Sequence, residues 1–288
     1  MARRQILVQL DSDDQPSVFD AVVAVDAEVD VLLRHGGVKP DRVRDLVYGA
    51  MFTRGPEDLH HTAIFVGGSD VAAGEELLRR VTQCFFGPMR VSVMIDANGA
   101  NTTAAAAVLA AARHVPLNNA TALVLAATGP VGQRAVRLLA GQGAKVRVAS
   151  RTLARAEAAC QAVLQRIPQA QLTPLAVVSD DEVRQAVDGT QVVIAAGAAG
   201  IQLLPERIRR SASDLKVAID LNAVPPAGIE GIQATDRGQQ REGAVCYGAI
   251  GVGGTKMKIH KAAVRQLFTA NNLVLDAEEI FALGQAMT

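Results

Sequence analysis

The sequence predicts an α/β protein: a Rossmann-type doubly wound parallel sheet plus a smaller N-terminal α/β domain. Short apolar runs alternate with segments of helical periodicity along all 288 residues. A glycine-containing turn at 127–132 joins one apolar run to an amphipathic helix near the middle of the chain. The length is sufficient for two domains that each bury a core.

The first hundred residues alternate strand and helix by themselves. Each apolar run ends in a polar or glycine-rich turn, and Ser17 is a plausible cap for the first helix. The expected strands are 6–10, 29–33, 62–66 and 91–95, and the expected helices are 17–24, 40–47, 71–85 and 101–114. This alternation predicts a parallel sheet in the N-terminal domain.

The alternation continues from Ala120 onward. The expected strands are 122–126, 146–149, 172–178, 191–196, 216–221 and 244–249. Helices are expected after the glycine turn and at 153–166, 180–187, 255–270 and 276–287, whereas the Gly- and Pro-rich stretch 225–243 is expected to be a loop. Ligands of such sheets bind beyond the carboxyl ends of the strands, so the candidate site residues are sought there.

The central turn has the pattern Ala127-x-Gly129-x-x-Gly132, with alanine in place of the usual first glycine. Gly129 would let the backbone approach a pyrophosphate, and Gly132 would let the helix pack closely on the strand. Pro130 suits the first turn of a helix, where free N–H groups can bind phosphate. The turn therefore predicts a dinucleotide site.

The end of the next strand indicates which dinucleotide binds. A carboxylate there would accept a hydrogen bond from the ribose 2′-hydroxyl of NAD, but this chain has Ser150-Arg151-Thr152, with Arg155 one turn on. A guanidinium between two hydroxyls suits the 2′-phosphate of NADP. The alternative is that both arginines are solvated residues at a helix start.

Three other strand ends carry candidate groups. Asp70 follows Gly67-Gly68 and is either a ligand for a ring N–H or the cap of the next helix. The stretch 96–103 offers amides and hydroxyls that suit a heterocycle or an ordinary turn. The stretch 248–261 is glycine-rich, but Thr255 precedes Lys256, an order that excludes a P-loop. Lys256 is expected at a helix start, where a lysine has no favourable interaction with the helix dipole. It is therefore a candidate residue of the substrate-binding cleft.

Composition excludes several other classes. Lys and Arg number 29, as do Asp and Glu, so nothing indicates nucleic acid or an anionic membrane surface as a partner. The three cysteines form no C-x-x-C pair, no metal site is expected, and no stretch of about 20 apolar residues occurs. A reduced, cytoplasmic protein is expected.

Taken in order, the motifs resemble the bacterial NADP-dependent methylene-tetrahydromethanopterin dehydrogenases, including members that also accept methylene-tetrahydrofolate. The residues that carry the resemblance are Pro16–Asp20, Phe52–Gly55, Thr62–Gly68 with Asp70, Cys84–Pro88, Asn98–Ala106, Thr128–Gly132, Ala195–Gly197, Asn222–Pro226 and Gly251–His260. The resemblance implies a pterin-side domain of residues 1–100 completed by the C-terminal helices at 256–288, and an NADP domain of residues 101–255. It also implies a homo-oligomer, as a trimer or hexamer.

The reaction that the resemblance implies is reversible hydride transfer from N5,N10-methylene-tetrahydromethanopterin to NADP⁺, giving the methenyl form in one-carbon metabolism. Lys256 is the expected catalytic residue, and the expected pterin contacts are Asp70, Asn98, Asn101 and Thr102. The expected NADP contacts are Thr128, Gly129, Pro130, Val131, Gly132, Ser150, Arg151, Thr152, Arg155, Ala196, Gly197 and Asn222. The alternatives are a methylene-tetrahydrofolate dehydrogenase, an NADP oxidoreductase similar to shikimate dehydrogenase, and a non-catalytic NADP-binding protein.

Overall fold

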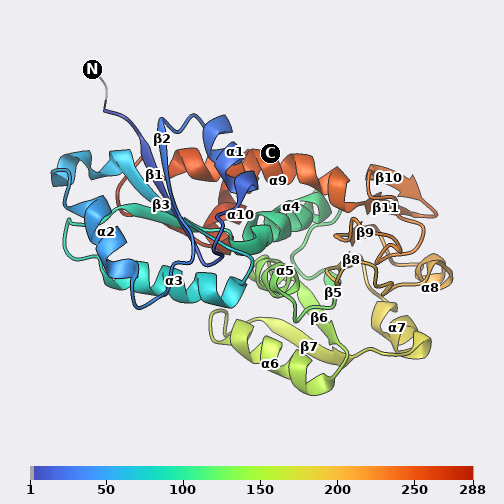
Figure 1. Cartoon of the computed structure of the whole chain (residues 1–288). Coiled ribbons are helices and arrows are strands. Elements are labelled where there is room, and N and C mark those ends of the chain that lie inside the picture. Colours follow the sequence, from blue (N-terminus) through green and yellow to red (C-terminus); the bar gives the residue numbers. More distant parts are fainter. Residues whose placement is uncertain (1–2, 288) are drawn as a thin grey trace. The chain divides into compact units, whose positions relative to one another are not determined.

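The computed structural model describes residues 3–287, and the chain divides into two compact units. Unit 1 comprises Met1–Thr102 with Met257–Thr288, and unit 2 comprises Thr103–Lys256. The division falls within helices α4 (Ala100–Ala112) and α9 (Ala249–Gln266), so both helices contribute to both units. The α/β fold class predicted from the sequence is confirmed (Figure 1).

Unit 1 is built on a five-stranded sheet in the order β2-β1-β3-β4-β12, with every pair parallel. Its elements are β1 (Ile6–Asp11), α1 (Val18–Asp26), β2 (Val31–His35), α2 (Val43–Met51), β3 (Thr62–Gly67), α3 (Val71–Gln83), β4 (Ser92–Ile95), β12 (Val274–Leu275) and α10 (Ala277–Ala286), with 3₁₀ turns at Pro56–His61 and Ala97–Gly99. Helices α2 and α3 cover one face, and α1 covers the other (Figure 1).

The direction of the connections reverses between β1 and β3. The chain leaves β1 through α1 toward β2, and leaves β3 through α3 toward β4 on the other side. Such a reversal opens a crevice at the carboxyl ends of the two strands, where open α/β sheets bind ligands. Asp11 and Gly67 are the paired last residues of these strands, so they mark the crevice.

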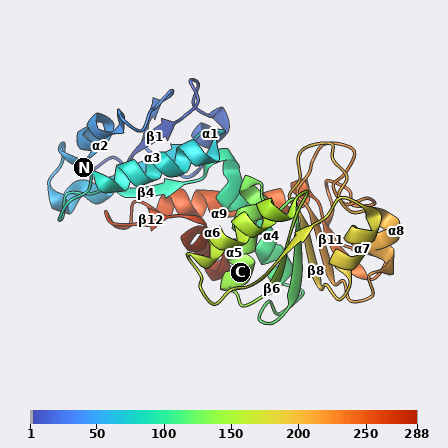
Figure 2. The ribbon, with the colours of Figure 1, turned by 90° about the horizontal axis from the view of Figure 1, so that it is seen from below.

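Unit 2 is built on a seven-stranded sheet in the order β7-β6-β5-β8-β9-β11-β10. Its elements are β5 (Thr121–Leu125), α5 (Pro130–Gly141), β6 (Lys145–Ser150), α6 (Leu153–Leu164), β7 (Gln171–Ala176), α7 (Asp180–Val187), β8 (Val192–Ala195), α8 (Glu206–Ser211), β9 (Val217–Asp220), β10 (Arg237–Arg241) and β11 (Ala244–Tyr247). The first six strands of that order are parallel and have the 3-2-1-4-5-6 order of dinucleotide-binding domains. Figure 2 shows α5 and α6 on one face and α7 and α8 on the other.

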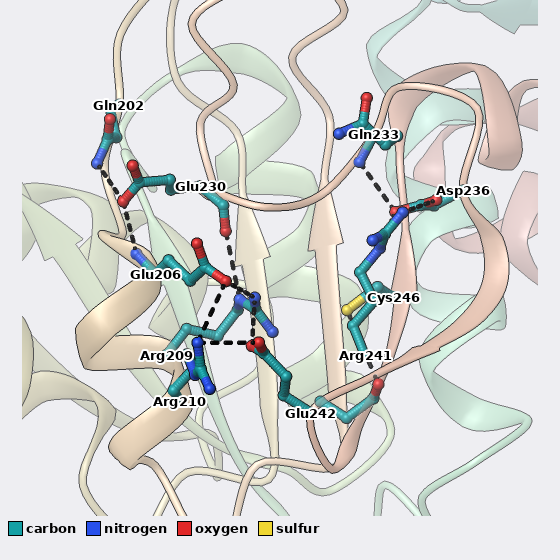
Figure 3. A network of polar contacts seen from close by, with 11 residues as sticks. Gln202, Glu206, Arg209, Arg210, Glu230, Gln233, Asp236, Arg241, Glu242 and Cys246 are labelled. Atoms are coloured by element: carbon teal, nitrogen blue, oxygen red, sulfur yellow. Dashed lines mark hydrogen bonds and ion pairs between the residues drawn. The ribbon is translucent and has the colours of Figure 1, made fainter.

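Two elements of unit 2 differ from the sequence-based expectation. The stretch expected to be a loop contains β10, which pairs antiparallel with β11 at the edge of the sheet. The short helix α8 was not expected either. Arg209 on α8 accounts for both elements: its buried guanidinium donates to Glu242 Oε2 at 3.0 Å, in the turn between β10 and β11 (Figure 3).

A third difference concerns α9. The helix was expected to begin near Thr255, but it begins at Ala249 and contains the glycine run. The N–H groups of Ile250 and Gly251 both donate to the carbonyl of Ala234, which fixes the first turn. This tertiary anchoring overrides the low helix propensity of glycine.

No described helix is both long and apolar enough to cross a membrane.

Candidate functional site

The dinucleotide turn lies at the point where strand order reverses in unit 2, between β5 and β8. Gly129 is the N-cap of α5, and Pro130 is the first helical residue. A Cβ on Gly132 would lie 2.8 Å from the Ala126 carbonyl oxygen and from Ala127 Cα, so only glycine fits there. This contact lets α5 begin directly against the end of β5.

Gly129 is different, because the protein itself would tolerate a side chain there. A Cβ would meet only the carbonyl oxygens of Ala126 and Ala196, at 3.6 and 3.7 Å, which are ordinary contacts. The missing side chain therefore leaves space in front of the α5 N-terminus, where N–H groups bind anions. Gly197 follows the carboxyl end of the neighbouring strand β8, where a Cβ would meet Leu203 Cδ1 at 2.7 Å.

The end of β6 and the first turn of α6 carry positive charge. Ser150 is buried, whereas Arg151, Thr152 and Arg155 are exposed. Within residues 3–287 neither arginine forms a hydrogen bond or an ion pair, and Thr152 makes no side-chain cap bond. Two guanidinium groups are thus available to an anion at the position that selects between NAD and NADP.

Asn222 has a structural role in this unit. Its amide donates to the Pro226 carbonyl at 3.0 Å, and its oxygen accepts from the Val224 N–H at 2.9 Å. Asp220, the last residue of β9, accepts the backbone N–H groups of Asn222 and Ile229. Burial nevertheless raises the pKa of Asp220, and these N–H bonds oppose the rise. Both side chains shape the loop that follows β9.

In unit 1, three of the four expected pterin-side residues are engaged within the protein. Asp70 caps α3 by accepting the Ala73 N–H at 3.1 Å, although the residue is exposed. The Asn101 amide donates to the Ile95 carbonyl at 2.7 Å and to Asp276 Oδ1 at 3.0 Å, and Thr102 donates to Asp96 Oδ2 at 2.6 Å. Because Asn101 and Thr102 are also buried, they support the turn rather than line it.

Asn98 is exposed in the turn Ala97–Gly99, which follows β4. Its backbone has φ 54°, a left-handed conformation that asparagine tolerates, and its N–H donates to the Gly68 carbonyl at 2.6 Å. This bond ties the turn after β4 to the glycine pair after β3. The Asn98 side chain is therefore presented at the carboxyl edge of the sheet.

Lys256 is half-buried in the middle of α9, not at a helix start as expected. The helix dipole acts only within the first turn, so it has no large effect on this ammonium group. His260 lies one turn further along the same face of α9 and is 1% exposed. Its ring stacks on Phe65 of β3, with ring centroids 5.6 Å apart.

Sequence comparisons relate the chain to known proteins. Residues 18–98 match the family model described as methylene-tetrahydromethanopterin dehydrogenase, N-terminal. The chain is 29% identical over 302 residues to the NAD(P)-dependent methylenetetrahydromethanopterin dehydrogenase of Methylorubrum extorquens, covering 98% of both chains. It is 44% identical over 286 residues to the bifunctional protein MdtA of the same organism, covering 99% of both chains. The chain belongs to the methylene-tetrahydromethanopterin dehydrogenase family.

Comparison with solved structures shows a shared fold. Shikimate 5-dehydrogenase from Listeria monocytogenes aligns with a TM-score of 0.52 and 12% identity, covering 99% of this chain and 96% of that one. Identity at this level shows a shared architecture.

Sequence reasoning missed two residues at the carboxyl edge of unit 1 in this family member. Asp20 lies on α1, and a Cβ on Gly67 would lie 3.5 Å from its Oδ2. His260 was given no role of its own, and its Nδ1 lies 3.7 Å from Asp96 Oδ2. The signal for Asp20 was its place in the Pro16–Asp20 motif; no local pattern links it to His260.

Proposed function

We propose that this chain catalyses the reversible oxidation of N5,N10-methylene-tetrahydromethanopterin to the methenyl form with NADP⁺ as the hydride acceptor. The observation that carries this proposal is the full-length relationship to the family, at 44% identity over 99% of the chain. The chain is a nicotinamide-dependent oxidoreductase, and its unit 2 has the strand order typical of dinucleotide-binding domains.

The residues of unit 2 fit a bound NADP. The space in front of Gly129 and the α5 N-terminus would hold the pyrophosphate, with Thr128, Pro130 and Val131 around it. Arg151 and Arg155, with Ser150 and Thr152, would hold the 2′-phosphate. Ala196 and Gly197 would border the nicotinamide side, with Asn222 shaping the neighbouring loop. When bound, the nicotinamide ring supplies the hydride acceptor.

We assign the pterin to the domain formed by residues 1–100 with 256–288, and NADP to the domain of residues 101–255. Asn98 and Asp70 would contact the pterin, and Asn101 and Thr102 would hold the turn that presents Asn98. Lys256 would be a catalytic residue that positions or polarises the reduced one-carbon carrier. Because the methenyl product is a cation, hydride transfer needs no accompanying proton transfer.

The decisive experiment follows NADPH absorbance with methylene-tetrahydromethanopterin and, in parallel, methylene-tetrahydrofolate. We expect turnover with the methanopterin substrate, and we expect Lys256→Ala to lower kcat by about tenfold or more. Lys258→Ala is the matched control, since Lys258 is an exposed lysine two positions along the same helix. Full turnover by Lys256→Ala would remove its catalytic role. Turnover with the folate alone would select the folate dehydrogenase, and NADP binding without turnover would select the non-catalytic alternative.

We further propose a cytoplasmic homo-oligomer, a trimer or a hexamer. In support, α1 exposes three valines at helical spacing: Val18, Val22 and Val25 are 70%, 55% and 67% exposed. A continuous apolar face of this kind typically marks a contact between proteins, and we assign it to a second copy of this chain.

A further inference from the structure

Four carboxylates near the carboxyl edge of the unit 1 sheet, Asp11, Asp13, Asp70 and Asp96, are held by protein donors. Asp11 accepts the N–H groups of Asp13 and Ser17, and Asp96 accepts the N–H and hydroxyl of Thr102. Asp13 accepts the N–H and hydroxyl of Ser69, and Asp70 caps α3. Through these bonds the four carboxylates stabilise the loops around the crevice.

Asp20 differs from these four carboxylates. Within residues 3–287 it forms no ion pair; the Ser17 side chain forms a hydrogen bond with it, and His260 attracts it electrostatically. Its carboxylate lies beside Gly67, where a Cβ would approach Asp20 Oδ2 at 3.5 Å and Asp11 Oδ2 at 3.2 Å. Gly67 is the last residue of β3 at the β1–β3 crevice, the position where a sheet of this order binds its ligand.

The surroundings of Asp20 leave its negative charge poorly compensated. Burial, with a smaller contribution from repulsion by Asp96 and Asp11, raises the pKa of Asp20 to about 6, and His260 on α9 and Ser17 on α1 oppose the rise. His260 is fixed from its other sides by the Phe65 ring and by Asp96 Oδ2 at 3.7 Å. A partly desolvated carboxylate whose negative charge is offset only in part, by His260, is electrostatically suited to a cation that arrives with the ligand.

The proposed reaction creates such a cation. The C–H bond of the methylene carbon breaks with its electron pair, and the hydride forms a new C–H bond at C4 of the nicotinamide. NADP⁺ is reduced, the pterin becomes a delocalised methenyl cation, and no proton is released. Lys256, the proposed catalytic residue, lies one turn before His260 on α9, and an ammonium group placed near the one-carbon centre would oppose that cation.

We propose that Asp20 is a further catalytic residue, whose carboxylate faces the one-carbon centre and stabilises the positive charge that develops there. His260 and Asp96 are positioning residues that hold the carboxylate side of the crevice. This inference rests on the proposed function, since it assigns a residue to that same pterin site.

The test compares binding of the two pterin forms, which differ by one positive charge. Dissociation constants of methylene- and methenyl-tetrahydromethanopterin are measured by calorimetry for the wild type, Asp20→Asn and Asp26→Asn. We expect Asp20→Asn to weaken the methenyl cation about tenfold or more and the neutral methylene form less than about threefold. Asp26→Asn, which removes an exposed carboxylate from the same helix, is expected to change neither.

The second readout is the pH profile of kcat in the oxidative direction. For the wild type we expect kcat to fall as pH drops through about 6, because Asp20 then becomes protonated and neutral. Asp20→Asn should lack that limb and have kcat lower by about tenfold or more throughout. Asp20→Glu, which keeps the charge, should restore part of the rate.

Folding is an independent control. A pKa raised from 3.8 to about 6 means that Asp20 contributes stability below about pH 4, and that this contribution is lost as pH rises through 6. Asp20→Asn should therefore unfold at no lower temperature than the wild type at about pH 8. Equal weakening of both pterin forms would make Asp20 a pterin-recognition residue, and no weakening would remove it from the site; either result overturns the inference. A wild type that binds neither pterin would instead refute the proposed function.

Discussion

At the scale of single residues, the sequence predicts an NADP side of the site because the candidate residues lie close together in the chain. Gly129, Gly132 and Pro130 fall within one turn, and Arg151 and Arg155 within another, so spacing alone predicts their roles. The structure adds that both arginines are exposed and, within residues 3–287, free of protein partners. This makes the 2′-phosphate contact the simplest use of their charge.

Cofactor preference provides the test at this scale. Arg151→Ala should raise KM for NADP⁺ by about ten- to a hundredfold and leave KM for NAD⁺ nearly unchanged, because only the 2′-phosphate contact is lost. Steady-state kinetics with both nucleotides measure the two effects. Arg113→Ala serves as a control, since Arg113 is an exposed arginine outside the dinucleotide turns. An equal loss for both cofactors would show that Arg151 supports the fold instead.

The pterin side was less predictable. Asn101 and Thr102 were expected to contact the substrate, yet their donors bind Ile95, Asp276 and Asp96. A turn rich in amides and hydroxyls has the same sequence whether those groups face a ligand or hold the turn together. Asp20 and His260 could not be paired from the sequence, because they lie on α1 and α9, far apart in the chain, and interact electrostatically only in the folded protein.

At the scale of elements, regular strands and helices were predicted closely, and elements defined by tertiary contacts were not. Helix α7 has the predicted bounds because Ser179 and Glu182 form a capping box that is visible in the sequence. Helix α8 and strand β10 have no such signal. They depend on Arg209, which donates to the Glu230 carbonyl and Glu242 from a side chain that is only 2% exposed (Figure 3).

This dependence predicts a large stability difference between neighbouring arginines. Arg209→Ala should lower the free energy of unfolding by about 2–4 kcal/mol, because it leaves a cavity and removes the link between α8 and the β10–β11 turn. Arg210→Ala should cost less than about 0.5 kcal/mol, since Arg210 contacts the same Glu242 from a side chain that is 60% exposed. Urea denaturation followed by circular dichroism measures both. Similar losses for the two variants would contradict the anchoring role of Arg209.

At the scale of the whole molecule, the sequence predicted two α/β sheets but not their extent. The alternation predicted the parallel direction of the unit 1 strands, but the strand orders of both sheets follow from pairings between distant segments, which periodicity does not reveal. In both sheets the direction of the connections reverses between two neighbouring strands, β5 and β8 in unit 2 and β1 and β3 in unit 1. Topology thus explains why the candidate residues of each unit gather where they do.

The exposed apolar face of α1 yields the prediction at this scale. Val25→Lys places a charge among Val18, Val22 and Val25, and burying that charge between two copies would be strongly unfavourable. Light scattering should therefore give a multiple of 30.2 kDa for the wild type and a smaller assembly for Val25→Lys. Val178→Lys, at a valine that is 72% exposed in unit 2, should leave the wild-type assembly intact. A wild type of single-chain mass would refute the oligomer, and an unchanged Val25→Lys assembly would place the contact on another surface.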